Sequence, residues 1–143
     1  MKESALLNVV IRELHRAAVG HFVRQNVAAF RIRDARTGDR FLRCGVKGQA
    51  DLWGVVHGWH VEIEVKTPKG RQSESQAAWE EKIRSHGGLY FICDRVDRLD
   101  RIDPRTGPRK TKLGRYSIEE IIAILRGLPQ RERMDGWETH SQR

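Results

Sequence analysis

The stretch from Trp59 to Lys66 constrains the fold of this chain more than any other part of its sequence. Apolar and polar residues alternate along it, which predicts an extended strand with one apolar and one charged face. The apolar face would carry Val61, Ile63 and Val65, and the charged face His60, Glu62, Glu64 and Lys66. The sequence therefore places a charged face on a strand that otherwise favours burial.

A second apolar run, residues 50–56, precedes this strand, and His57-Gly58 between the two runs has the composition of a tight turn. The two runs are predicted to form an antiparallel hairpin. Because Asp51 and the Glu64–Lys66 segment both lie several residues from the turn, pairing brings them together. Two carboxylates and an ammonium at one place favour a hard divalent cation among them, since Mg²⁺ binds one or two carboxylates together with waters and phosphate oxygens.

The same residues resemble a known family of nucleases. An Asp followed by Glu-x-Lys at the end of a hairpin is the pattern of the PD-(D/E)xK nuclease superfamily. The surrounding motifs resemble the VRR-NUC family, especially its small stand-alone phage and bacterial members, from Glu3 to about Asp94. These motifs are Gly48-x-x-Asp51, Ile63-Glu64-Val65-Lys66-Thr67, the loop Pro68-Lys69-Gly70-Arg71-Gln72-Ser73, and Gln76. Family members usually have Pro directly before the Asp, where this chain has Ala50.

The resemblance implies an α/β fold with a restriction-endonuclease-like αβββαβ core, to which this chain adds a C-terminal helix. It also implies a site for Mg²⁺ or Mn²⁺. Asp51, Glu64 and the main-chain carbonyl of Val65 would hold the ion. Glu3, on the first helix, would complete the metal shell directly or through water, with Glu13 as the substitute.

Lys66 and Gln76 have catalytic roles by the same resemblance. Lys66 would orient or deprotonate the attacking water, or stabilise the pentacovalent phosphate, and Gln76 would point toward Lys66 and the substrate. Gln76 has an alternative role, because Ser73-x-x-Gln76 has the form of a capping box in which Gln76 turns back to the Ser73 amide. Glu3 also has one, because a carboxylate at a helix start is favoured by the unpaired amides and the helix dipole.

The charge of the chain indicates a polyanionic partner. The net charge is +8 and the isoelectric point about 10.1, which favours nucleic acid, although such charge also serves solubility alone. Lys47, Lys69 and Arg71 lie nearest the acidic cluster in sequence and are the candidate phosphate contacts. On the charged strand face, Glu62 is expected to face solvent and His60 to be a packing or surface residue.

The remaining segments are assigned from periodicity and turn signals. We expect a helix over residues 3–25 capped by Ser4, strands over 26–33 and 40–44, a helix from Ser73 to Ser85, and a buried strand over 89–93 parallel to the Glu64 strand. Residues 94–103 fit a short helix or an irregular segment equally well. A basic loop over 104–116 and a helix capped by Ser117 complete a single domain, residues 1–128, followed by a flexible tail, residues 129–143.

Two details of these segments bear on partners and compartment. Arg31, Arg33, Arg40 and Arg43 would share one rim of a hairpin, as either a solvated face or a phosphate-contacting one. Cys44 and Cys93 are too few and too far apart for a zinc site and are expected to be buried thiols. With no apolar run long enough to cross a bilayer and no signal peptide, the expected compartment is the cytoplasm of a bacterial or phage-infected cell.

These observations predict a metal-dependent DNA endonuclease, without a membrane or small-molecule cofactor. Small VRR-NUC proteins resemble structure-selective nucleases that act on junctions or flaps as dimers, which implies a homodimer here. Two other classes stay open: a catalytically silent nucleic-acid-binding module, and an interaction subunit of a phage or repair complex that docks through the basic loop and the Trp137 tail.

Overall fold

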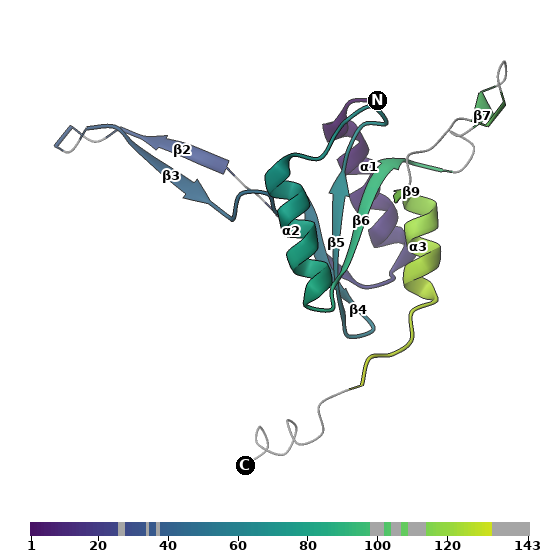
Figure 1. Ribbon diagram of the computed structural model, residues 1–143. Helices are drawn as coiled ribbons and strands as arrows, with labels where there is room; N and C mark the ends of the chain where they lie inside the picture. The colour runs from purple at the N-terminus through teal and green to yellow at the C-terminus, as the bar shows by residue number, and fades with distance from the viewer. Residues whose placement is uncertain are drawn as a thin grey trace, which may run out of the picture.

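The computed structural model describes residues 1–25, 28–33, 35–36, 38–97, 102–103, 107–108 and 114–132. Its elements, most of them labelled in Figure 1, are α1 (Glu3–Ala17), β1 (His21–Arg24), β2 (Ala28–Ile32), β3 (Arg40–Cys44), β4 (Leu52–Val56), β5 (Trp59–Val65), α2 (Glu74–Ser85), β6 (Leu89–Arg95), β7 (Ile102–Asp103), β8 (Gly107–Pro108), β9 (Arg115–Ser117) and α3 (Ile118–Arg126). The α/β class expected from the sequence is confirmed.

A five-stranded mixed sheet with the order β1-β4-β5-β6-β9 forms the centre of the molecule. β1, β4 and β5 pair antiparallel, whereas β5, β6 and β9 run parallel. Helices α1 and α3 cover one face of the sheet and α2 covers the other (Figure 1). The core lies under α1 and α3, where the apolar face of β5 packs among Leu, Val and Ile side chains of both helices. Its fully buried members include Val10, Leu14, Val61, Ile63, Val65, Ile121 and Leu125.

The first helix is shorter than the sequence predicts. α1 ends at Ala17, Ala18 takes a left-handed conformation with φ 49°, and His21–Arg24 form an edge strand instead of two more helical turns. Gly20 explains the break, because a Cβ there would lie 2.6 Å from the main-chain oxygen of Val55. Lys2, which makes no side-chain cap, is the N-cap, so the expected cap at Ser4 is wrong.

The expected elements around the site are confirmed. β4 and β5 form a hairpin, with φ of 51° at His57 and 83° at Gly58 in the turn. α2 opens on the Ser73 capping box, and β6 follows it parallel to β5. Ser117 caps α3 in the same way.

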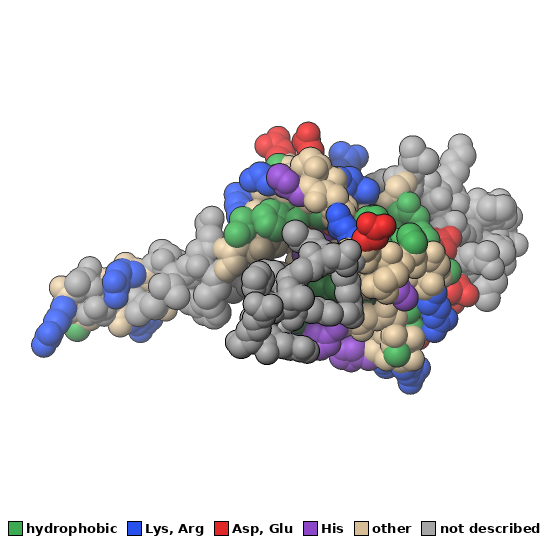
Figure 2. Space-filling model, turned by 90° about the horizontal axis from the view of Figure 1, so that it is seen from below, with side chains coloured by type: hydrophobic (Ala, Val, Ile, Leu, Met, Phe, Trp, Pro, Cys, Tyr) green, Lys and Arg blue, Asp and Glu red, His purple; other side chains and the backbone are tan. Residues whose placement is uncertain are grey.

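The strands β2 and β3 form a separate two-stranded hairpin that projects from the body (Figures 1 and 2). Its register pairs Arg31 with Phe41 and Ile32 with Arg40. Residues opposite one another share a face, so Arg31 and Arg40 lie on opposite faces. The expectation of one shared arginine rim is wrong for this pair. The side chains of Arg43 and Cys44 lie outside the part of the chain that the structure describes.

The C-terminal segments also differ from expectation. β6 continues through Asp94 and Arg95, and Arg115 lies in β9 and not in a basic loop. Residues 129–132 pack back on the β4–β5 turn: Trp59 Nε1 donates to the Pro129 carbonyl at 2.9 Å, and Arg131 N donates to the His57 carbonyl at 2.8 Å. Trp137 lies outside the described residues, among which we find no helix with the length and apolarity to span a membrane.

Candidate functional site

Asp51 is held at the start of β4 by the neighbouring strand. Its Oδ2 accepts a hydrogen bond from the main-chain N–H of Val65 at 2.7 Å, and its own carbonyl accepts from Gln25 N at 2.7 Å. Burial raises the pKa of the Asp51 carboxyl, while the Val65 N–H, Lys66 and Arg24 lower it. The hairpin thus fixes one carboxylate of the predicted site beside the end of β5.

Glu64 is the second carboxylate, and it is fully buried. Its pKa is raised from 4.5 to about 7, chiefly by burial and also by the Asp51 charge, while Lys66, Tyr90 and Gln72 act in the opposite direction. Tyr90 Oη donates to Glu64 Oε1 at 3.3 Å. Among the described residues, Glu64 Oε2 has no hydrogen-bond partner. A buried, unpartnered carboxylate oxygen costs stability unless a cation or a proton occupies the place beside it.

Lys66 follows directly on the same strand and is half-buried. Its ammonium lies close enough to Asp51 and Glu64 to lower the pKa of both carboxyls. Its main-chain N–H donates to the Cys93 carbonyl at 2.9 Å, which continues the pairing of β5 with β6. The structure therefore brings Asp51, Glu64 and Lys66 together, as the hairpin predicts.

Glu62 does not face solvent, contrary to the expectation from the sequence. It is 1% exposed because α2 covers this face of the sheet. Trp79 Nε1 donates to Glu62 Oε1 at 2.8 Å, and His60 Nε2 lies 3.1 Å from Glu62 Oε2. His60 itself stacks on the Trp53 ring at 5.9 Å, which fits its expected packing role. Glu62 thus fastens α2 to β5.

Gly48 brings the segment before Asp51 against the first turn of α2. It has φ 93°, and a Cβ at this position would lie 2.3 Å from the Ser75 carbonyl oxygen. Both the left-handed backbone and the close approach exclude a side chain.

We expect Gly48→Ala to reduce the free energy of unfolding by at least about 2 kcal/mol, because it adds backbone strain and a clash with main-chain atoms. Gly38→Ala is the matched control, since Gly38 has φ 78° but nothing within 4 Å of an added Cβ. Urea denaturation of both variants measures the difference. Equal losses in the two would show that the contact with Ser75 contributes nothing.

Gln76 adopts the alternative role that the sequence left open. Its Oε1 accepts from Ser73 N at 2.9 Å, and its N–H donates to Ser73 Oγ at 3.2 Å, which completes the capping box of α2. Gln72 instead takes the place beside the acidic residues. It donates to Glu80 at 3.1 Å and interacts with both Glu64 and Tyr90.

The structure does not bring Glu3 into this group. Glu3 is exposed at the first position of α1, and Glu13, its expected substitute, lies further along the same helix. No group of three or more His, Cys, Asp or Glu side chains placed to hold a metal occurs within the described ranges. The two carboxylates of Asp51 and Glu64 are therefore the acidic side chains available at this place. Val65 contributes its main chain, with its N–H already bound to Asp51.

The candidate phosphate contacts Lys47, Lys69 and Arg71 are all exposed. Two further arginines lie nearer the site than the sequence indicates. Arg24, at the end of β1, is close enough to lower the pKa of Asp51. Arg115 donates from Nη1 to the Thr67 carbonyl at 3.2 Å and from Nη2 to the Gly70 carbonyl, so it holds the loop that carries Lys69. The sequence alone does not indicate that Arg24 and Arg115 lie near the site, because the pairing of β1 and β9 in the sheet brings them there.

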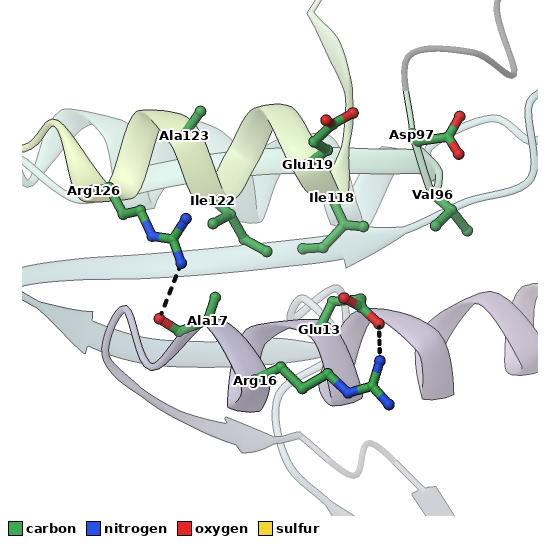
Figure 3. A pocket seen from close by; sticks show the side chains of 10 residues that line it. All are labelled: Glu13, Arg16, Ala17, Val96, Asp97, Ile118, Glu119, Ile122, Ala123 and Arg126. Carbon is green, nitrogen blue, oxygen red and sulfur yellow. Dashed lines mark hydrogen bonds and ion pairs between the residues drawn. The ribbon is translucent and has the colours of Figure 1, made fainter.

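A groove of about 600 Å³ lies elsewhere, between α1 and α3 (Figure 3). Glu13 and Arg16 of α1 border it on one side and Ile118, Ile122 and Arg126 of α3 on the other, and Arg126 reaches the Ala17 carbonyl. Because α1 and α3 cover the face opposite α2, this groove is separated by the sheet from Asp51 and Glu64.

No family model matches the chain, and no curated protein matches it significantly.

Proposed function

We propose that this protein is a metal-dependent nuclease that hydrolyses phosphodiester bonds in DNA. The observation that carries the proposal is the buried, unpartnered Oε2 of Glu64, next to a second carboxylate, Asp51, and an ammonium, Lys66. Carboxyl groups whose pKa is strongly raised by burial gather at functional sites. A module that only binds nucleic acid has no use for buried like charges.

The donor set fits Mg²⁺ or Mn²⁺. Such hard ions take oxygen ligands and commonly bind proteins through one or two carboxylates, with waters and substrate phosphates completing the shell. Asp51 and Glu64 would hold the ion, together with the main-chain carbonyl of Val65. When bound, it lowers the pKa of a water and neutralises charge on the scissile phosphate.

Lys66 supplies the remaining chemistry from the chain itself. Its ammonium, beside both carboxylates, can hold the attacking water by a hydrogen bond or stabilise the extra negative charge on the phosphate. Tyr90 keeps the Glu64 side chain in place through its hydrogen bond, and Gln72 interacts with both Glu64 and Tyr90. Arg24 lies close to Asp51, and Lys47, Lys69 and Arg71 are exposed cations that would contact neighbouring phosphates.

The order of elements supports the finer assignment of the fold. Taken in sequence, α1, β1, β4, β5, α2 and β6 give the αβββαβ order of a restriction-endonuclease-like core, with β2 and β3 inserted and β9 and α3 added. Together with the motifs from Gly48 to Gln76, this order supports membership of the VRR-NUC family and, by that likeness, a homodimer acting on branched DNA.

The experiment that tests the function is cleavage of labelled single-stranded, duplex, flap and four-way-junction DNA with Mg²⁺, Mn²⁺ or chelator. We expect products only with metal, and the preferred substrate identifies the class of branched DNA. Binding without cleavage under every metal would overturn the nuclease and leave a silent binding module.

The two glutamines provide a prediction about positioning. We expect Gln72→Ala to slow cleavage by about tenfold, because it removes a polar side chain that interacts with Glu64 and lowers the pKa of its carboxyl, an interaction worth about 1–1.5 kcal/mol. Gln76→Ala, the matched control, loses only a helix-capping contact and should leave the rate within about threefold at a stability cost of about 1 kcal/mol. Single-turnover cleavage rates of the two variants measure the difference. A larger loss of rate in Gln76→Ala than in Gln72→Ala would show that Gln76, and not Gln72, acts at the catalytic site.

A further inference from the structure

The β2–β3 hairpin is inserted into the sheet directly beside the candidate site. It leaves after Arg24, the last residue of β1, and the chain re-enters the sheet at Asp51 and β4. The ends of the insertion are tied together, because Arg24 pairs with Leu52 and Gln25 N donates to the Asp51 carbonyl at 2.7 Å. The hairpin therefore projects from a fixed base at one of the two carboxylates (Figure 1).

This hairpin is basic and stands apart from the main sheet. Residues 28–44 include Arg31, Arg33, Arg36, Arg40 and Arg43 against Asp34 and Asp39. The side chains of Arg31, Arg33, Arg36 and Arg40 are described and exposed, and Arg31 donates from Nε to Asp39 at 2.9 Å. Figure 2 shows positively charged side chains along the projecting hairpin and at its far end. An isolated two-stranded hairpin is only marginally stable in water, and contact with a partner would stabilise it.

We propose that the β2–β3 hairpin is a basic arm that grips duplex DNA next to the candidate site at Asp51 and Glu64. A two-stranded ribbon fits the major groove of B-DNA, and the arginines exposed on both of its faces would meet phosphates on both sides of the groove. Strands of five residues reach about 17 Å. That length spans about five base pairs beyond the site. The choice of DNA as the ligand of this arm rests on the proposed nuclease function, but the binding test below does not require cleavage.

The test is DNA binding in chelator, so that no cleavage takes part. The arm variant carries Arg33→Gln and Arg36→Gln, and the matched control carries Arg12→Gln and Arg16→Gln. The control arginines are exposed on α1, on the other face of the sheet from α2. We expect the arm variant to bind a duplex of about three helical turns roughly tenfold more weakly near 0.1 M salt. The slope of log K against log salt should fall by about 2, whereas the control changes affinity less than about threefold.

Three results would overturn this proposal. Equal losses in the arm and control variants would show only a general effect of charge. An equal loss on a single strand of the same length would remove the assignment to duplex DNA. An altered sedimentation coefficient with unchanged DNA affinity would make the hairpin a contact between copies of the chain. If the arm variant binds duplex DNA more weakly but the protein cleaves no DNA, the proposal of a DNA-binding arm stands and the proposed nuclease function is refuted.

Discussion

Replacing Lys66 by alanine is expected to slow DNA cleavage by about 10²- to 10⁴-fold, the range found when a group that transfers a proton or stabilises developing charge is lost. Lys66 is the cation whose charge lowers the pKa of both the Asp51 and the Glu64 carboxyl groups. Because the loss concerns the chemical step, it should appear in the single-turnover rate at saturating protein and leave DNA affinity nearly unchanged.

The matched control is Lys82→Ala, which removes the same side chain from an exposed position of α2. It should cleave at the wild-type rate. Circular dichroism and DNA affinity in chelator check that both variants are folded. A Lys66→Ala protein that cleaves within about threefold of wild type would remove Lys66 from the mechanism and leave the two carboxylates alone at the centre.

Glu64→Gln is expected to stabilise the metal-free protein at alkaline pH. The pKa of Glu64 is raised from 4.5 to about 7 in the folded state, so the folded protein holds this proton more tightly than the unfolded chain. Its stabilising contribution is complete below pH 4.5 and is lost as the pH rises toward and through 7. Between pH 5 and pH 8, wild type should therefore lose about 2–3 kcal/mol of unfolding free energy relative to Glu64→Gln.

Urea denaturation in chelator at the two pH values measures this difference, with Glu81→Gln on the exposed side of α2 as the control. Adding Mg²⁺ at pH 8 should then stabilise wild type, by about 2.7 kcal/mol at a hundred times its dissociation constant, and should not stabilise Glu64→Gln. If the difference in unfolding free energy between wild type and Glu64→Gln did not change with pH, ionisation of Glu64 would cost the folded protein nothing. The inference that buried Glu64 requires a proton or a cation would then be wrong.

The parts of the fold that depend on local signals are those the sequence predicts correctly. The β4–β5 hairpin follows from alternation and the His57-Gly58 turn, and α2 and α3 begin at the Ser73 and Ser117 capping boxes. The sequence predicts too long a first helix, because Phe22 continues the helical stripe beyond Ala17, where α1 ends. Only the contact of Gly20 with β4, which is distant in sequence, shows where the helix must end.

The surroundings of the site depend on long-range packing, which is why they escaped prediction. Glu62 is buried only because α2 places Trp79 over it. Tyr90 reaches Glu64 across the β5–β6 register, and Arg115 reaches the loop after β5 from the far edge of the sheet. The sequence indicates Gln76 as the glutamine of the site, but the capping geometry of Ser73 engages Gln76, and Gln72 interacts with Glu64 instead.

The most direct test of the central claim is anomalous diffraction from crystals grown with Mn²⁺. Mn²⁺ scatters anomalously and binds the same hard oxygen ligands as Mg²⁺. We predict one strong peak in contact with both Asp51 and Glu64, absent from crystals of Glu64→Gln grown in the same way. Well-ordered crystals with no peak at these carboxylates, or with a peak only elsewhere, would contradict the metal centre and the nuclease built on it.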